Sequence, residues 1–145
     1  MKEKTMKKLL LALLAVSATG AAFADGIVGK WRTIDDATKK PKAIIQITES
    51  GGIYSGRIVA LEAGVDPNCG DCDNAQKGKP LVGQTVLRGL RLDGDAYTGG
   101  KITDPKSGKV YSAKATVANG GKSLQVRGFM GISALGRTQT WQRVQ

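Results

Sequence analysis

The feature that most constrains the fold is a repeated pattern of short alternating runs that end in glycine-containing turns. Apolar residues alternate with polar ones in each run, as at Ala43, Ile45 and Ile47, and Gly51 and Gly52 then end that run. A period of two is typical of strands with one buried face. No long run shows the period of an amphipathic helix, and glycine fills 20 of 145 positions, about twice its usual share. The sequence therefore predicts an all-β protein.

The pattern predicts eight strands, most of them joined by short hairpins. We expect them at or around residues 27–34, 43–47, 53–61, 84–92, 97–103, 110–117, 124–128 and 137–144. On the fourth strand the alternation places Val86, Leu90 and Leu92 on one face. Asp93 and Gly94 are expected to form a tight turn, because glycine accepts a positive φ at little cost. The one long connection runs over residues 62–80.

Eight sequential antiparallel strands must hide their apolar face. A single open sheet would expose that face and leave two unpaired edges, whereas a closed sheet removes both problems. At eight strands the interior is filled by side chains or holds one small ligand. A two-sheet sandwich would require more long crossovers than the single one present. We therefore predict an eight-stranded antiparallel up-and-down barrel.

The first 24 residues resemble a cleaved secretory signal peptide rather than part of the fold. Lysines near the start precede an apolar run, LLLALLAV, and Ala22-Phe23-Ala24 matches a cleavage site. The run is shorter than the roughly 20 residues that span a bilayer, although an uncleaved anchor helix is the alternative. We expect export across a bacterial inner membrane to the periplasm or beyond, one domain over residues 25–145, and no integral membrane protein.

The charge and the missing histidines restrict the possible functions. Without the leader the chain keeps about seven net positive charges of the ten in the full sequence. They fit either ordinary solvated faces or attraction to anionic envelope material such as lipid headgroups or polysaccharide. Nucleic acid is not expected, since no basic–aromatic stripe is present. The absence of histidine excludes Ser-His-Asp and Cys-His devices. We expect no catalytic residue, no cofactor and no metal.

The only two cysteines, Cys69 and Cys72, lie within the long connection and have two residues between them. In the oxidising compartment that export implies, a neighbouring pair usually forms a disulfide. Thiol redox activity is the alternative, but Asp66, Asp71 and Asp73 surround the pair, and negative charge raises the pKa of a thiol. A metal site is a third possibility, although structural zinc takes four good ligands. A disulfide is the favoured prediction.

The two ends of the chain carry residues suited to closing a barrel. Gly29 and Trp31 lie on the first predicted strand, and Arg137, Trp141 and Arg143 lie on the last. These strands are neighbours in an eight-stranded barrel. A tryptophan at their seam could plug one end, and an arginine could cover its ring.

Several short motifs together resemble one bacterial family. They are Gly29-Lys30-Trp31, Gly56-Arg57-Ile58-Val59, the Cys69/Cys72 pair, Lys79-Pro80-Leu81-Val82-Gly83, Gly99-Gly100-Lys101-Ile102, Asp104-Pro105-Lys106-Ser107-Gly108-Lys109, and Arg127-Gly128-Phe129 with Gly136-Arg137-Thr138-Gln139-Thr140-Trp141. In this order the chain resembles the exported, lipocalin-like family known as domain of unknown function 2147. The resemblance implies a lipocalin-like barrel and export. It implies no activity and no catalytic residues.

Two functional hypotheses follow from a closed barrel. In the first, the barrel binds a small apolar or amphipathic ligand, with small residues leaving room and tyrosines offering a polar handle. The expected lining residues are Tyr54, Gly56, Ile58, Tyr97, Tyr111, Ala113 and Phe129. In the second, the barrel is filled and serves as an interaction module of the cell envelope. Its contacts would then come from residues 62–80 and 128–136, where Phe129, Met130, Ile132 and Leu135 form an apolar patch or lid.

Overall fold

The structure is a computed structural model that describes residues 26–132 and 134–144. The predicted signal peptide lies outside the described residues. Eight strands account for most of the rest: β1 (Gly29–Ile34), β2 (Pro41–Ser50), β3 (Ile53–Leu61), β4 (Thr85–Asp93), β5 (Ala96–Thr103), β6 (Val110–Ala118), β7 (Ser123–Phe129) and β8 (Gly136–Val144). Two short 3-10 helices, η3 (Asn74–Gln76) and η4 (Asn119–Gly121), lie in the connections.

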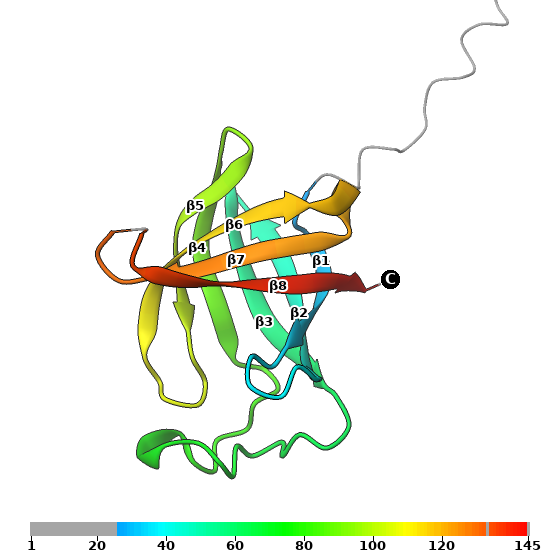
Figure 1. Cartoon of the computed structure of the whole chain (residues 1–145), viewed down its shortest axis with the longest axis vertical. Coiled ribbons are helices and arrows are strands. Elements are labelled where there is room, and N and C mark those ends of the chain that lie inside the picture. Colours follow the sequence, from blue (N-terminus) through cyan, green and yellow to red (C-terminus); the bar gives the residue numbers. More distant parts are fainter. Residues whose placement is uncertain (1–25, 133, 145) are drawn as a thin grey trace, which may run out of the picture.

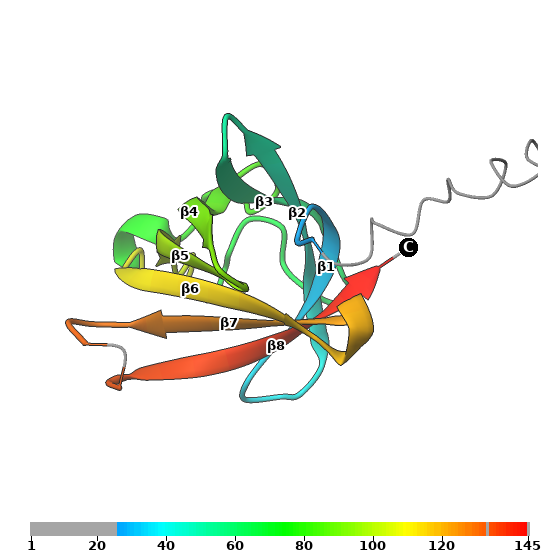
Figure 2. The same ribbon diagram turned by 90° about the horizontal axis from the view of Figure 1, so that it is seen from above.

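The strands form one closed antiparallel barrel in the order of the sequence (Figures 1 and 2). Each strand pairs with the next, and β8 returns to pair with β1. The predicted all-β, eight-stranded up-and-down barrel is confirmed. In the part of the chain that the structure describes, no helix has the length and apolar character needed to cross a membrane.

The two ends of the barrel differ in how they are covered. At one end, here called the closed end, β1 begins, β8 ends and the hairpin turns after β2, β4 and β6 are tight. The other end, here called the open end, carries longer connections over residues 35–40, 62–84, 104–109 and 130–135. Figure 1 shows the longest of them, in green, extending beyond the barrel between β3 and β4.

Buried apolar side chains form one core cluster. The largest fully buried side chains, Trp31, Ile27, Ile47, Leu87, Leu90, Leu124 and Val126, come from strands all round the barrel and from the segment before β1. The expected alternation holds on β2, where Ala43, Ile45 and Ile47 are buried. On β4 it holds only in part, because Val86 and Leu90 are buried as expected, whereas Leu87 is also buried and Leu92 is 55% exposed. Gly89, with φ 77°, interrupts the alternation of that strand.

Candidate functional site

Trp31 and Arg143 meet at the closed end of the barrel. The Trp31 ring is fully buried, and its Nε1 donates to the carbonyl of Ile27 at 2.9 Å. The Arg143 guanidinium carbon lies 4.3 Å from the centroid of that ring, a cation–π distance. The same guanidinium donates to the carbonyls of Gly26 (2.6 Å), Gly121 (2.6 Å) and Val28 (3.2 Å). One side chain therefore ties three chain segments across this end.

The other residues expected at the barrel seam have different positions. A Cβ on Gly29, whose φ is 140°, would lie 2.9 Å from Nη1 of Arg143, so the close approach requires glycine. Trp141 is buried, and its Nε1 donates to Oε1 of Gln139 at 3.0 Å. Arg137 is the second residue of β8, at the open end, and its Nε lies 3.4 Å from a carboxylate oxygen of Asp36. The arginine over Trp31 is Arg143, and Arg137 has no part in that stack.

The expected ligand-lining residues do not form one site. Tyr54 and Tyr97 lie near the closed end, where their ring centroids are 4.9 Å apart in an edge-on arrangement. Burial raises the pKa of the Tyr97 hydroxyl, and the proximity of Tyr54 adds to the rise, whereas a backbone hydrogen bond from Ile27 opposes it. Tyr111 is the second residue of β6 and Phe129 is the last of β7, so both half-buried rings lie near the open end.

The remaining three, Gly56, Ile58 and Ala113, are buried between these ends, and neighbouring side chains occupy the space that small residues leave. A Cβ on Gly56 would lie 2.9 Å from Cγ2 of Ile45. One on Gly100 would lie 2.7 Å from Cδ2 of Leu90, and one on Gly128 would lie 3.2 Å from Cγ2 of Ile102. Distances below about 3.4 Å leave no gap between carbon atoms. At Gly56, Gly100 and Gly128 the interior of the barrel is therefore packed.

Two hollows among the described residues lie in the wall of the barrel. One, of about 160 Å³, lies over β2, β3 and β4 and is lined mostly by polar residues such as Gln46, Ser55 and Thr85. The other, of about 360 Å³, lies between residues 34–39 and residues 138–142. Both are smaller or more polar than a typical enclosed site for an apolar ligand.

The second hollow exists because β1 and β8 pair over a short stretch. Three residue pairs join them, ending at Arg32 and Gln142. Beyond that point Asp36 bridges to β8, accepting a hydrogen bond from Nε2 of Gln139 at 3.3 Å. The backbone N–H of Thr38 donates to Asp35 at 2.9 Å, and this hydrogen bond lowers the pKa of Asp35 below its ordinary value.

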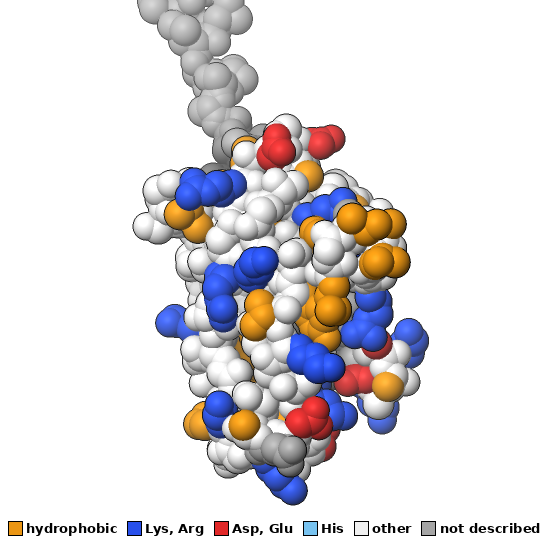
Figure 3. Space-filling model, turned by 90° about the vertical axis from the view of Figure 1, so that its left-hand side faces the viewer, with side chains coloured by type: hydrophobic (Ala, Val, Ile, Leu, Met, Phe, Trp, Pro, Cys, Tyr) orange, Lys and Arg blue, Asp and Glu red, His pale blue; other side chains and the backbone are white. Residues whose placement is uncertain are grey.

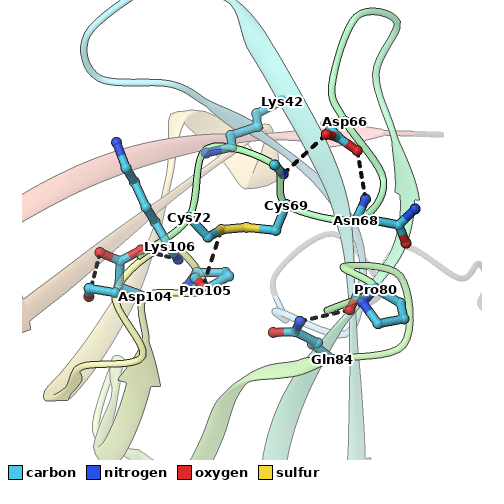
Figure 4. Close-up of a disulfide and its surroundings, with 12 residues drawn as sticks. Lys42, Asp66, Asn68, Cys69, Cys72, Pro80, Gln84, Asp104, Pro105 and Lys106 are labelled. Atoms are coloured by element: carbon cyan, nitrogen blue, oxygen red, sulfur yellow. Dashed lines mark hydrogen bonds between the residues drawn. A yellow bond between two sulfur atoms is a disulfide. The ribbon is translucent and has the colours of Figure 1, made fainter. Parts of the chain in front are cut away.

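Cys69 and Cys72 form a disulfide in the connection between β3 and β4 (Figure 4). Their Cα atoms are 5.3 Å apart, as usual for such a bond, and both side chains are buried. The loop is held to the β5–β6 turn, since Sγ of Cys72 lies 3.6 Å from the carbonyl oxygen of Pro105 and the N–H of Asp73 donates to the carbonyl of Lys106 at 2.8 Å. The pair thus anchors one open-end connection to another.

Asp71 brings a carboxylate oxygen within 4.8 Å of both sulfur atoms. These three side chains are the set closest to a metal-ligand group among the described residues. Sulfur atoms joined in a disulfide are not thiolates, which are the form that binds zinc. A set of one carboxylate and two disulfide sulfurs does not fit a structural metal site.

The connection between β7 and β8 carries an exposed apolar group, here called the apolar tip. It consists of Met130, Ile132 and Leu135, which are 64%, 63% and 66% exposed. Two backbone hydrogen bonds, from Met130 to Leu135 and from Leu135 to Ile132, hold this loop closed at 3.2 Å and 3.0 Å. Figure 3 shows the face on the side of this loop, where hydrophobic side chains gather near one edge and basic side chains are spread over the rest.

A row of basic residues, here called the basic wall, lies on the strands beside the tip. It consists of Arg88, Lys101, Lys114 and Arg127. Lys114 stands directly opposite Arg127, and Arg88 stands directly opposite Lys101. Like charges in directly opposed positions destabilise a sheet. Within the described strands β4–β8, Asp93 is the one acidic residue.

The apolar tip was predictable from the sequence, whereas the basic wall was not. Lys114 and Arg127 gave no hint of a charge cluster, because they are 13 positions apart in the chain. Their opposition follows from the register of β6 and β7. Pairing residues outward from the 119–121 turn could have revealed it.

Comparisons with known proteins show which family the chain belongs to. No curated protein matches the chain. A solved structure, protein HP1028 from the human pathogen Helicobacter pylori, described as belonging to the lipocalin family, is similar with a TM-score of 0.69. The match covers 83% of this chain and 84% of that one at 19% identity, so it supports the fold alone. The family described as "Uncharacterized protein conserved in bacteria (DUF2147)" matches residues 29–143. The chain therefore belongs to this bacterial family, and its barrel is lipocalin-like.

Proposed function

We propose that this protein is an exported, non-enzymatic interaction module of the bacterial cell envelope. Its barrel acts as a rigid support, and the connections at the open end make the contacts. The leader-like first 24 residues and the lack of histidine in the whole sequence support export and a role without catalysis.

The observation that carries this proposal is the packing of the barrel interior. The three glycines that face inward, Gly56, Gly100 and Gly128, each meet another side chain at or near contact distance. A carrier of the lipocalin kind needs an enclosed apolar space of several hundred cubic ångströms. Here Ile45 and Leu90 occupy the space beside two of these glycines, Gly56 and Gly100.

Binding of a small apolar or amphipathic ligand within the barrel is the second candidate. The similarity to a structure of the lipocalin family favours it. It requires that inward side chains such as Ile102 and Tyr111, which lie toward the open end, move aside when the ligand enters. The filled barrel needs no such rearrangement, and we therefore prefer the interaction module.

Native mass spectrometry of the protein purified gently from its own host separates the two candidates. We expect the mass of residues 25–145 with one disulfide and with nothing else bound. That mass also tests cleavage after Ala24. A stoichiometric apolar molecule retained by the folded protein would overturn the filled barrel in favour of a carrier. Retention of the first 24 residues would overturn processing at the expected site.

A further inference from the structure

We propose that the apolar tip and the basic wall dock this protein on an anionic phospholipid bilayer. The tip enters the interface between headgroups and acyl chains, and the wall contacts the headgroups. This inference rests on the proposed location in the envelope and names the partner of that module.

The tip is built to present apolar surface to a partner. Three large apolar side chains lie within six residues of one short loop, and each is more than three-fifths exposed. The other strongly exposed apolar side chains, Val28, Val82, Leu92 and Val110, are scattered over other elements. Isolated exposed residues are ordinary, whereas a contiguous group marks a site of interaction.

The basic wall adjoins the base of the apolar tip through Arg127. Nη2 of Arg127 donates to the carbonyl of Ala134 within the loop at 3.3 Å, and Nη1 donates to Oγ1 of Thr138 on β8 at 2.9 Å. This guanidinium therefore joins the base of the tip to the wall. Lys114 lies opposite Arg127 on the next strand, and Nζ of Lys101 lies 3.4 Å from Oγ of Ser112, the residue paired with Phe129.

An anionic bilayer matches both parts of this surface. Basic residues near a negatively charged leaflet are attracted to it, and apolar side chains gain by entering its interface. The mutual repulsion of Lys114 and Arg127 would also fall once anionic headgroups lie beside them. An acidic polysaccharide would match the charges but would give the apolar tip nothing to bury. A protein partner would need a broad complementary face of about 800 Å², and the loop is a narrow projection.

Sedimentation with sucrose-loaded vesicles tests the proposal. The mature chain is mixed with vesicles of phosphatidylcholine alone or of phosphatidylcholine with about one third phosphatidylglycerol, which supplies the negative surface potential. We expect binding to the anionic vesicles, with weaker binding at high salt because salt screens surface charges. We expect the double variant Ile132→Ser, Leu135→Ser to bind those vesicles at least about tenfold more weakly.

Further variants test whether the loss of vesicle binding is specific to the apolar tip and the basic wall. Leu92→Ser removes an apolar side chain that is 55% exposed at the opposite end of the barrel, and we expect its binding to match that of the parent. Lys114→Gln is expected to weaken binding about fivefold at low salt, whereas Lys30→Gln, an equal loss of charge on β1, leaves it unchanged. Circular dichroism checks that every variant keeps the fold.

A fluorescent reporter supplies a positive signal for insertion. Both natural tryptophans, Trp31 and Trp141, are buried, so they give a steady background. We expect Ile132→Trp to show a blue shift on addition of anionic vesicles and the parent to show none.

Three results would overturn the docking proposal. They are equal sedimentation with both kinds of vesicle, unchanged binding in the tip variant, and tip-dependent dimerisation in the absence of lipid, seen by analytical ultracentrifugation. None of these concerns the barrel interior. A failed vesicle assay with a ligand-free native mass rejects the bilayer alone, whereas a ligand found in the barrel rejects the proposed function itself.

Discussion

A methyl group added at Gly56 gives the sharpest test of the packed interior. The new Cβ would lie 2.9 Å from Cγ2 of Ile45 and 3.3 Å from Cβ of Leu87. Neither atom moves easily, because Ile45 is β-branched and 2% exposed and a Cβ moves only with its backbone. We expect Gly56→Ala to destabilise the protein, although alanine in a strand is otherwise more favourable than glycine.

The size of the effect is the difference of two terms. Overpacking of a close-packed core costs about 1–3 kcal/mol. Replacing glycine by alanine restricts the unfolded chain and returns about 0.4–1 kcal/mol. The net loss is therefore about 1 kcal/mol, which corresponds to a fall in melting temperature of about 4 °C for a domain of this size.

A double-mutant cycle assigns the loss to the contact. Ile45→Ala removes the crowding methyl group and by itself costs about 2–5 kcal/mol as a large-to-small core change. In that background, Gly56→Ala should be neutral or slightly stabilising, which gives a coupling energy of about 1–2 kcal/mol. Urea unfolding followed by tryptophan fluorescence measures each variant. Ser55→Ala, on the outer face of the same strand, is the control and should lie within about 0.5 kcal/mol of the parent.

The reasoning is refuted if Gly56→Ala is as stable as the parent, or if the two changes are additive. Either result would mean that open space adjoins Gly56. The barrel would then contain a cavity, and the ligand carrier would become the better hypothesis.

Three further predictions concern the closed end, the disulfide and pH. Arg143→Ala should lower the free energy of unfolding in urea by about 2–3 kcal/mol, because it removes charged hydrogen bonds to three carbonyls. Arg143→Lys should restore only part of this stability, since lysine lacks the planar fork of arginine. Full restoration by lysine would contradict this account. Replacing Cys69 and Cys72 by alanine should lower the free energy of unfolding by less than about 3 kcal/mol, since the closed ring is small. It should also speed proteolysis within residues 62–84 while the circular dichroism spectrum stays unchanged. Loss of the β spectrum would show that the loop is needed for the fold. Because the pKa of Tyr97 is raised, its contribution to stability is intact below the ordinary tyrosine pKa and is lost as the pH rises above it. Because the pKa of Asp35 is lowered, its contribution is present above the ordinary aspartate pKa and is lost as the pH falls. Ultraviolet titration of the tyrosines and carboxyl NMR titration measure the two shifts. A Tyr97 that ionises below the ordinary tyrosine pKa, or an Asp35 that titrates above the ordinary aspartate pKa, would contradict them.

The barrel was predictable from local patterns in the chain. Alternation at Ala43, Ile45 and Ile47 depends on neighbours in sequence, and so does the tight turn after β4, which falls one residue later than predicted because Asp93 pairs with Ala96. Closure follows from the need to bury eight apolar faces. On β4 the strict alternation fails: Leu87 and Leu90, three residues apart, are both fully buried, and Gly89 with its positive φ lies between them. The choice between Arg137 and Arg143 also depended on register, which fixes the residue of β8 that reaches Trp31.

The sequence by itself determined the fold class, the strand order, the cysteine pair and the apolar character of the loop after β7. Each of these is encoded within a few consecutive residues or in the composition of the whole chain. Only the tertiary structure decided that the space beside Gly56 is taken by Ile45, that Lys114 faces Arg127, and that Tyr54 and Tyr111 lie toward opposite ends of the barrel. These facts depend on contacts between residues far apart in the chain, and strand register and barrel closure set those contacts.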